Sequence, residues 1–148
     1  MRTIHAASLL RLSSLDEPTP DGAVLVVGDR IGAIGPADEL TQAYPEVRVR
    51  RWAGTLGPAL LHDGPLPPAP TPRERVHALF RLGAGAVLAA HVADPGLRAA
   101  AVRNDVAILE RVRPTELILT GRADLAVFAE DGSCLATVVA GRLVHRRA

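Results

Sequence analysis

The chain has 148 residues, of which 48% are hydrophobic and 22% charged, so it contains enough apolar material for the core of one domain. Its formal net charge of +1 excludes a strong overall field for nucleic acid or anionic lipid, and its one cysteine excludes an internal disulfide or a thiolate zinc cluster. Because no apolar run reaches signal-peptide length or the ~18 residues of a membrane span, we expect a cytoplasmic protein.

Residues 1–52 are predicted to be rich in β-strand. Gly28, Asp29 and Arg30 separate two apolar runs with residue types that are typical of a hairpin turn. Gly35 and Pro36 end the second run, and a short helix is expected to follow. The last run alternates valine with arginine, which predicts a strand with one face in water. The predicted strands are residues 3–12, 23–27, 31–34 and 47–52, and the helix is 37–44.

Residues 53–120 are predicted to form a small α/β insert. A segment with five prolines, residues 63–72, is expected to be a linker. Asp94 is a candidate N-cap, because a proline follows it at the start of a helical pattern. A strand, a helix and a strand in close succession indicate one parallel crossover unit. Residues 56–61 are predicted as a short strand or an extended arm, the further strands are 86–90 and 106–109, and the helices are 73–82 and 95–104.

Residues 121–148 are predicted to return to β-structure, with a tight turn at 130–132. Cys134 lies in an apolar run and is expected to be a small buried hydrophobic residue. The predicted strands are 124–128, 135–139 and 143–146. We therefore expect an α+β fold in which the two chain ends, 1–52 and 121–148, form a composite β-sandwich, with residues 53–120 as a βαβ insert.

Three motifs carry a resemblance to a known family. They are DGAVLVVGDRIGAIG at residues 21–35, GRADLAVF at 121–128 and VVAGRLVH at 138–145. Together they resemble the composite domain of the amidohydrolase superfamily, in particular the imidazolonepropionase-like and cytosine deaminase-like branches. The resemblance implies that a TIM barrel stands between the two β segments. Such a barrel needs about 250 residues, so the insert here replaces it.

The resemblance also implies where catalytic residues would lie. Active relatives bind metal through two histidines that follow the first barrel strand, and in this chain Gly64 and Leu66 occupy those positions. The binuclear branch also uses a carbamylated lysine, and all 17 basic residues here are arginine. Without the metal there is no activated hydroxide as nucleophile. The resemblance therefore predicts no cofactor and no family-type catalysis.

One residual constellation could still carry chemistry. His62 and Asp63 follow one predicted strand, while His91 and Asp94 follow another, and the carboxyl ends of parallel strands converge on a crevice. His62 and His91 could bind a divalent metal, and all four could act as acid and base. The competing interpretation is that they are linker, strand-end and N-cap residues. No site role is expected for the remaining histidines, His5, His77 and His145.

Three functional hypotheses remain open. In the first, the chain is a non-catalytic, amidohydrolase-like β-sandwich protein that acts by binding or assembly, as a homodimer. In the second, it is a metal-dependent hydrolase of non-peptide C–N bonds with a reduced site. In the third, it is a regulatory domain that binds a small ligand between sandwich and insert. Membrane and nucleic-acid partners are not expected, because the net charge is low and only 3% of the residues are aromatic.

Overall fold

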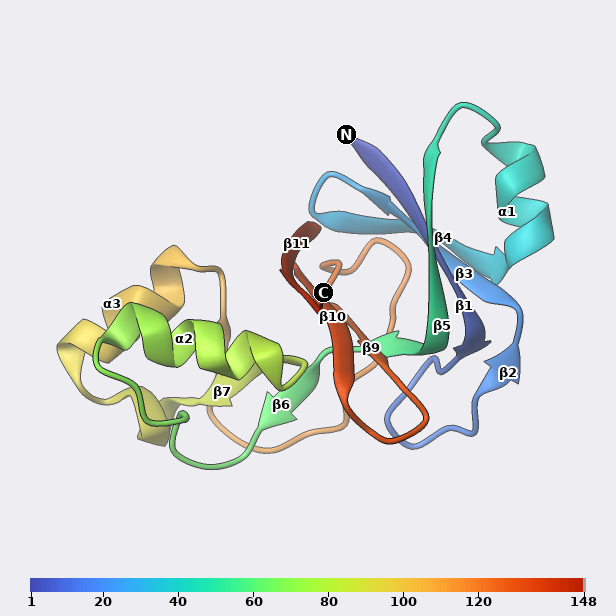
Figure 1. The fold of residues 1–148 in the computed structure, drawn as a ribbon. Helices are drawn as coiled ribbons and strands as arrows, with labels where there is room; N and C mark the ends of the chain where they lie inside the picture. The colour runs from blue at the N-terminus through green and yellow to red at the C-terminus, as the bar shows by residue number, and fades with distance from the viewer. Residues whose placement is uncertain (148) are drawn as a thin grey trace.

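The computed structural model describes residues 1–147, and in this part of the chain it shows a mixed α+β fold with one large and one small β-sheet (Figure 1). Nearly every predicted helix and strand is present, with small shifts at the ends. The N-terminal elements are β1 (Arg2–Leu10), β2 (Thr19–Pro20), β3 (Gly22–Val27), β4 (Arg30–Pro36), α1 (Ala37–Ala43) and β5 (Arg48–Pro58). The central elements are β6 (Leu60–His62), α2 (Pro72–Arg81), β7 (Ala84–Leu88), η1 (Ala89–Val92), α3 (Pro95–Arg103) and β8 (Ala107–Leu109). The C-terminal strands are β9 (Leu125–Phe128), β10 (Cys134–Val139) and β11 (Arg142–Arg146).

Strands from both ends of the chain share the large sheet. Its order is β11-β10-β9-β5-β1-β3-β4, with β2 paired to β1. The connection between the two ends is the antiparallel pairing of β5 with β9, from Thr55 opposite Phe128 to Pro58 opposite Leu125. Strands from the two chain ends thus belong to one sheet, although the residues of β5 that pair with β9 lie beyond the predicted boundary at residue 52.

Residues 56–61, predicted as a short strand or an extended arm, are divided between two strands. The first part of this segment is the end of β5, where Leu56 is fully buried in the core of the large sheet, and the second part belongs to β6. The hydrogen bonding changes sheet at this point, because the Ala59 amide donates to Asp124 whereas the Leu60 amide donates to Gly83. The apolar run is continuous in sequence, but its backbone partners are not.

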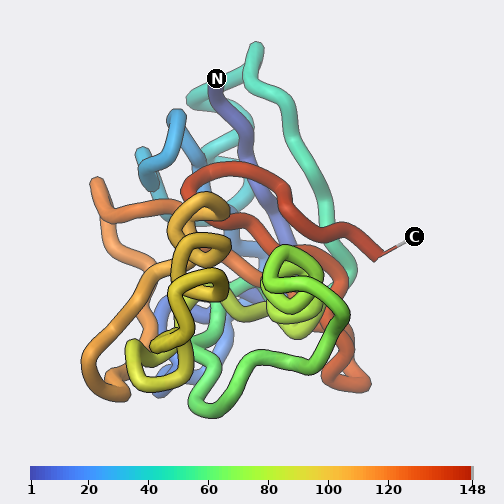
Figure 2. Tube along the Cα trace, turned by 90° about the vertical axis from the view of Figure 1, so that its left-hand side faces the viewer, coloured from blue at the N-terminus to red at the C-terminus, as the bar shows by residue number. Residues whose placement is uncertain are grey.

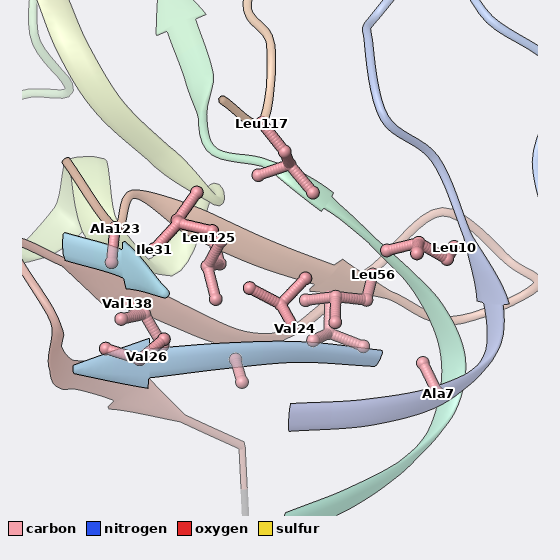
Figure 3. Packing of buried hydrophobic residues seen from close by; sticks show 12 residues of the cluster. Ala7, Leu10, Val24, Val26, Ile31, Leu56, Leu117, Ala123, Leu125 and Val138 are labelled. Carbon is pink, nitrogen blue, oxygen red and sulfur yellow. The ribbon is translucent and has the colours of Figure 1, made fainter. Parts of the chain in front are cut away.

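The large sheet is strongly curved, so that its β3–β4 end faces β9 and β10 across an apolar core. Val26 and Ile31 from one end meet Leu125 and Val138 from the other, as Figure 3 shows. The core consists of Ala7, Leu10, Val24, Val26, Ile31, Leu56, Leu117, Ala123, Leu125, Val127, Ala136 and Val138. On the outer face of the sheet, α1 buries Leu40 against a second cluster that includes Ile4 and Leu25.

Three turns meet where the curved sheet closes. The Gly141 amide donates to the Ala123 carbonyl, and the Ala123 amide donates to the carbonyl of Asp29, in the turn between β3 and β4. Gly141 has φ +78 and lies so close to Gly28 that an added Cβ would be 1.9 Å from the Gly28 carbonyl oxygen. We call this contact between the turns at 28–29, 121–124 and 140–141 the closure. All three motifs behind the family resemblance contribute to it.

The small sheet and two helices form the insert, at the opposite end of the molecule from α1 (Figure 1). Strands β6, β7 and β8 are parallel, and α2 and α3 lie side by side (Figure 2). Thr71 caps α2 by accepting from the Glu74 amide, and its hydroxyl also donates to the Glu74 carboxylate. The insert core reaches into the terminal hairpin through Val139 and Val144. Thr137 also donates to the Phe80 carbonyl over 2.6 Å.

Candidate functional site

His62 is held by the proline-rich segment that follows it. It is the last residue of β6, and its Nε2 lies 2.9 Å from the carbonyl oxygen of Pro65. Asp63 is exposed and begins the linker. One ring nitrogen of His62 is therefore already engaged by the backbone of its own loop.

His91 does not end a strand, which corrects the sequence-based prediction. Strand β7 ends at Leu88, and His91 lies in the 3₁₀-helix η1. Asp94 is the N-cap of α3, as predicted, because its Oδ2 accepts from the Leu97 amide over 2.9 Å. Within residues 1–147, no group of three or more His, Cys, Asp or Glu side chains lies close enough to hold a metal ion. The four candidate residues thus do not converge as a three-ligand centre.

Gly64 and Leu66 occupy the two positions where the resemblance places metal-binding histidines, and neither lies in a cluster of polar side chains that could bind metal within residues 1–147. Leu66 is only 2% exposed and packs in the core of the insert with α2 and α3. Arg75 on α2 donates to the carbonyl oxygens of Leu66, over 2.8 Å, and Pro67, over 3.2 Å. At Gly64, no atom lies within 4 Å of the position that a Cβ would occupy. This segment therefore anchors the linker to α2.

A cavity of about 450 Å³ lies between the small sheet and residues 113–124. Ala86 and Ala107 of the small sheet line one side, and Arg113, Glu116 and Asp124 are among the residues on the other. A second cavity of about 360 Å³ lies beside β5. The first cavity occupies the place between sheet and insert where the sequence analysis expects a ligand pocket.

Arg122 and Asp124, which also line this cavity, form a pair at the closure. Arg122 Nε donates to both carboxylate oxygens of Asp124, over 3.0 and 2.8 Å. The same carboxylate accepts from the Ala140 amide over 2.8 Å and so fixes the turn of the terminal hairpin. The Arg122 Nη2 is buried and has no acceptor among the described residues. The pair thus serves the fold by joining two of the motifs.

The structure reveals one constellation that the sequence analysis did not predict. Arg48, Arg50 and Trp52 lie at alternate positions of β5, Arg146 of β11 lies against Trp52, and we call these four residues the basic face. The Arg146 guanidinium lies 5.6 Å from the centre of the Trp52 ring. Burial, and then the positive charges of Arg48 and Arg146, lower the pKa of Arg50. The alternating arginines of residues 47–52 were the available signal, but the contribution of β11 is visible only in the fold.

His5 supports the basic face from β1. It is 3% exposed, and its Nδ1 accepts from the Trp52 indole over 3.2 Å. Burial, followed by the charge of Arg50, lowers the pKa of His5 to about 4. His5 is therefore neutral at physiological pH and holds the only tryptophan of the chain in place.

The other two histidines and the cysteine, for which no site role was expected, pack within the fold. His77 packs edge-on against Phe80, with ring centres 6.0 Å apart, and His145 is half-buried in β11. Cys134 is buried, as predicted, and burial raises the pKa of its thiol. A raised pKa lowers the thiolate fraction, so this cysteine is not activated as a nucleophile.

Comparisons with known proteins show which domain and which folds this chain is similar to. Residues 22–46 match the bacterial imidazolonepropionase-like composite domain. This segment includes the hairpin of β3 and β4, on which the first motif lies. Together with the similar folds described next, the match confirms the resemblance to amidohydrolase composite domains.

Solved structures of this superfamily share the fold. Guanine deaminase of E. coli is similar with a TM-score of 0.56 and 13% identity, over 73% of this chain and 35% of that chain. Guanine deaminase of Bradyrhizobium japonicum gives 0.52 at 12% identity, over 72% and 34%. Ochratoxinase of A. niger gives 0.51 at 15%, over 72% and 29%. This chain thus spans about a third of the length of these enzymes, and no curated protein matches it in sequence. Across residues 1–147, no helix combines the length and apolarity that membrane spanning requires.

Proposed function

We propose that the chain is a non-catalytic, amidohydrolase-like β-sandwich protein that acts by binding or assembly. The observation that carries the proposal is Leu66, because an apolar side chain in the insert core stands where the resemblance places a ligand histidine. Catalytic zinc sites use about three protein ligands and an open position. Neither Gly64 nor Leu66 can supply one of those ligands through its side chain.

Metal analysis and an activity assay test this proposal against the hydrolase alternative. That alternative is a C–N hydrolase in which His62, Asp63, His91 and Asp94 form the site, and guanine is a substrate to try because two similar structures are guanine deaminases. We expect far less than one equivalent of Zn, Fe, Mn or Ni in protein purified without chelator, and no ammonia release from guanine. Stoichiometric metal that His62→Ala and His91→Ala both remove would establish the alternative.

Assembly as a homodimer is supported by an exposed apolar surface on two adjacent loops. The Leu117 amide donates to the Leu12 carbonyl over 2.7 Å, which places the two loops side by side. Their exposed side chains are Leu12, Leu15, Val112, Ile118 and Leu119. Apolar surface of this kind favours association. We expect light scattering at micromolar concentration to show a dimer that Ile118→Ser weakens, whereas Val102→Ser on α3 leaves it intact. A monomer at these concentrations would remove the assembly part of the proposal.

Binding of a small ligand is the second candidate, and the cavity of about 450 Å³ beside Arg113 and Glu116 favours it. Cavities of this size accept drug-sized molecules. Screening by thermal shift against nucleosides, imidazoles and small amides tests it. We expect a shift with at least one class, and a panel without any shift would count against this candidate.

A further inference from the structure

We propose that the basic face is a binding site for a small anion that carries two or more phosphate charges. This inference adds a site that shares no residue with the cavities described above, and it holds whether or not the chain has catalytic activity. It rests on the placement of three arginines, on the absence of a salt bridge to any of them within residues 1–147, and on the contact of one of them with Trp52, which His5 supports.

The strand register places the arginines of β5 on one face of the sheet. Residues 48, 50 and 52 alternate along β5, so Arg48, Arg50 and Trp52 point to the same side. In the parallel pairing with β1, His5 lies opposite Arg50. Arg146 comes from β11, at one end of the sheet order and separated from β5 by β10 and β9, and it reaches the same place through its contact with the Trp52 ring.

No salt bridge within residues 1–147 includes an arginine of the basic face. In the described part of the chain, salt bridges join Arg2 to Glu46, Arg30 to Asp29, Arg122 to Asp124 and Arg142 to Asp105. None of them includes an arginine of the basic face. Glu46, which precedes β5, is engaged by Arg2 at 3.6 Å. The positive charges of Arg48 and Arg146 act on Arg50 and lower its pKa, in a protein whose net charge is only +1.

The positive charges of Arg48 and Arg146 repel that of Arg50, and a bound anion would relieve this repulsion. A guanidinium is always charged and offers a planar fork of donors that matches phosphate oxygens. An anion with two phosphate groups can accept bidentate hydrogen bonds from several guanidinium groups at once, whereas chloride has no pair of oxygens to accept them. This chemistry is shared by free pyrophosphate and by the diphosphate of a nucleotide.

Trp52 and His5 give the face a fixed geometry. The rings of His5 and Trp52 are stacked with centres 6.3 Å apart, and the indole donates to the buried imidazole. The Arg146 guanidinium lies over the Trp52 ring, in the arrangement of a cation–π pair. A side chain that is held in advance loses less conformational entropy when a ligand binds. Because Trp52 is the only tryptophan, its fluorescence reports directly on the face.

The competing explanation is that the arginines protect a strand edge. On the side away from β1, β5 pairs with β9 only from Thr55 to Pro58, so the part from Arg48 to Gly54 is open. Charged side chains on open edges prevent pairing with other chains. That role needs charge on the strand itself, and it does not require Arg146 of β11 to be stacked on Trp52. The two explanations differ in whether an anion binds with defined stoichiometry.

The test is titration of the full chain with pyrophosphate and with ADP at constant ionic strength. Binding is measured by Trp52 fluorescence and, independently, by calorimetry, with sodium chloride and adenosine as controls. The variants are Arg50→Gln and Arg146→Gln, with Arg98→Gln as matched control because Arg98 is exposed on α3. Circular dichroism confirms that each variant is folded.

We expect saturable binding of pyrophosphate and ADP with one site per chain. Loss of a charge-assisted contact should weaken it by about tenfold or more in Arg50→Gln and Arg146→Gln, but not in Arg98→Gln. The proposal is overturned by absence of saturable binding, by equal weakening in all three variants, or by adenosine binding as tightly as ADP. Binding of a single-stranded oligonucleotide without binding of either diphosphate would also overturn it. Metal content does not enter this experiment, so its failure is distinguishable from that of the proposed function.

Discussion

Replacing Gly141 by alanine should destabilise the protein far more than the same change at another glycine with positive φ. At Gly141, the new Cβ would lie 1.9 Å from the Gly28 carbonyl oxygen, 2.9 Å from its carbon and 3.0 Å from the Asp29 Cα. These are backbone atoms, so no side-chain rotation relieves the overlap, and the closure must open. Gly132 is the matched control, because it has φ +87 in the turn before β10 but nothing within 4 Å of its Cβ position.

The cost of left-handed backbone and the cost of the steric overlap can be estimated separately. Left-handed backbone alone costs an alanine about 1–2 kcal/mol, which is the expected loss for Gly132→Ala. Gly141→Ala adds an overpacking cost of about 1–3 kcal/mol, giving about 2–5 kcal/mol in total. Domains of this kind have unfolding free energies of about 5–15 kcal/mol, so the variant is expected to fold but with a clearly lower urea midpoint. If the two variants differ by less than about 0.5 kcal/mol, the closure is not the rigid contact described above.

Three further predictions concern His5, Leu66 and Asp124. Because burial lowers the pKa of His5 from 6.5 to about 4, the unfolded chain takes up the proton first as the pH falls. The unfolding free energy should therefore drop by about 3 kcal/mol between pH 6.5 and 4, and urea titrations across this window should show a smaller drop in His5→Gln. Leu66→Ala should cost about 2–5 kcal/mol in the same assay, whereas Leu60→Ala, at a side chain that is 40% exposed, should cost much less, and equal losses would contradict the packing of Leu66. Asp124→Asn should cost about 1–3 kcal/mol by weakening the hold on Arg122 and the Ala140 amide. Asp105→Asn, in an exposed pair, should lower stability by less than about 1 kcal/mol, and a larger loss there than at Asp124 would refute this reading.

The sequence predicted most elements of the fold because its signals are local. Gly28 separates two apolar runs, and Asp94 stands before a proline and a helical pattern, so hairpin and N-cap followed from residue type alone. The failures occurred where the decisive partner is distant. Residues 56–61 read as one apolar strand or extended arm, yet Ala59 bonds to Asp124 and Leu60 to Gly83. Periodicity cannot show that the backbone changes sheet between two adjacent residues.

The geometry of the candidate site at His62 and His91 also depends on residues outside the local sequence pattern. Strand-end placement suggested that His62 and His91 converge, but the 3₁₀-helix after β7 takes up His91 and the linker carbonyl of Pro65 engages His62. The basic face was missed for the opposite reason, because net charge is a sum over the chain. A value of +1 is compatible with arginines scattered evenly and also with three of them around one tryptophan. Only the pairing of distant strands distinguishes the two.

The residues that carry the resemblance to amidohydrolase composite domains are also those whose structural roles are most fully accounted for. Gly28, Ala123, Asp124 and Gly141 meet at the closure, where each supplies a turn conformation or a hydrogen bond that the curved sheet requires. Motifs explained in this way carry no information about the ligand or the partner. The specific function should therefore be sought in residues that the fold does not require. Arg48 and Arg50 on the open part of β5 meet that criterion, since they enter no salt bridge within residues 1–147 and their mutual repulsion opposes folding.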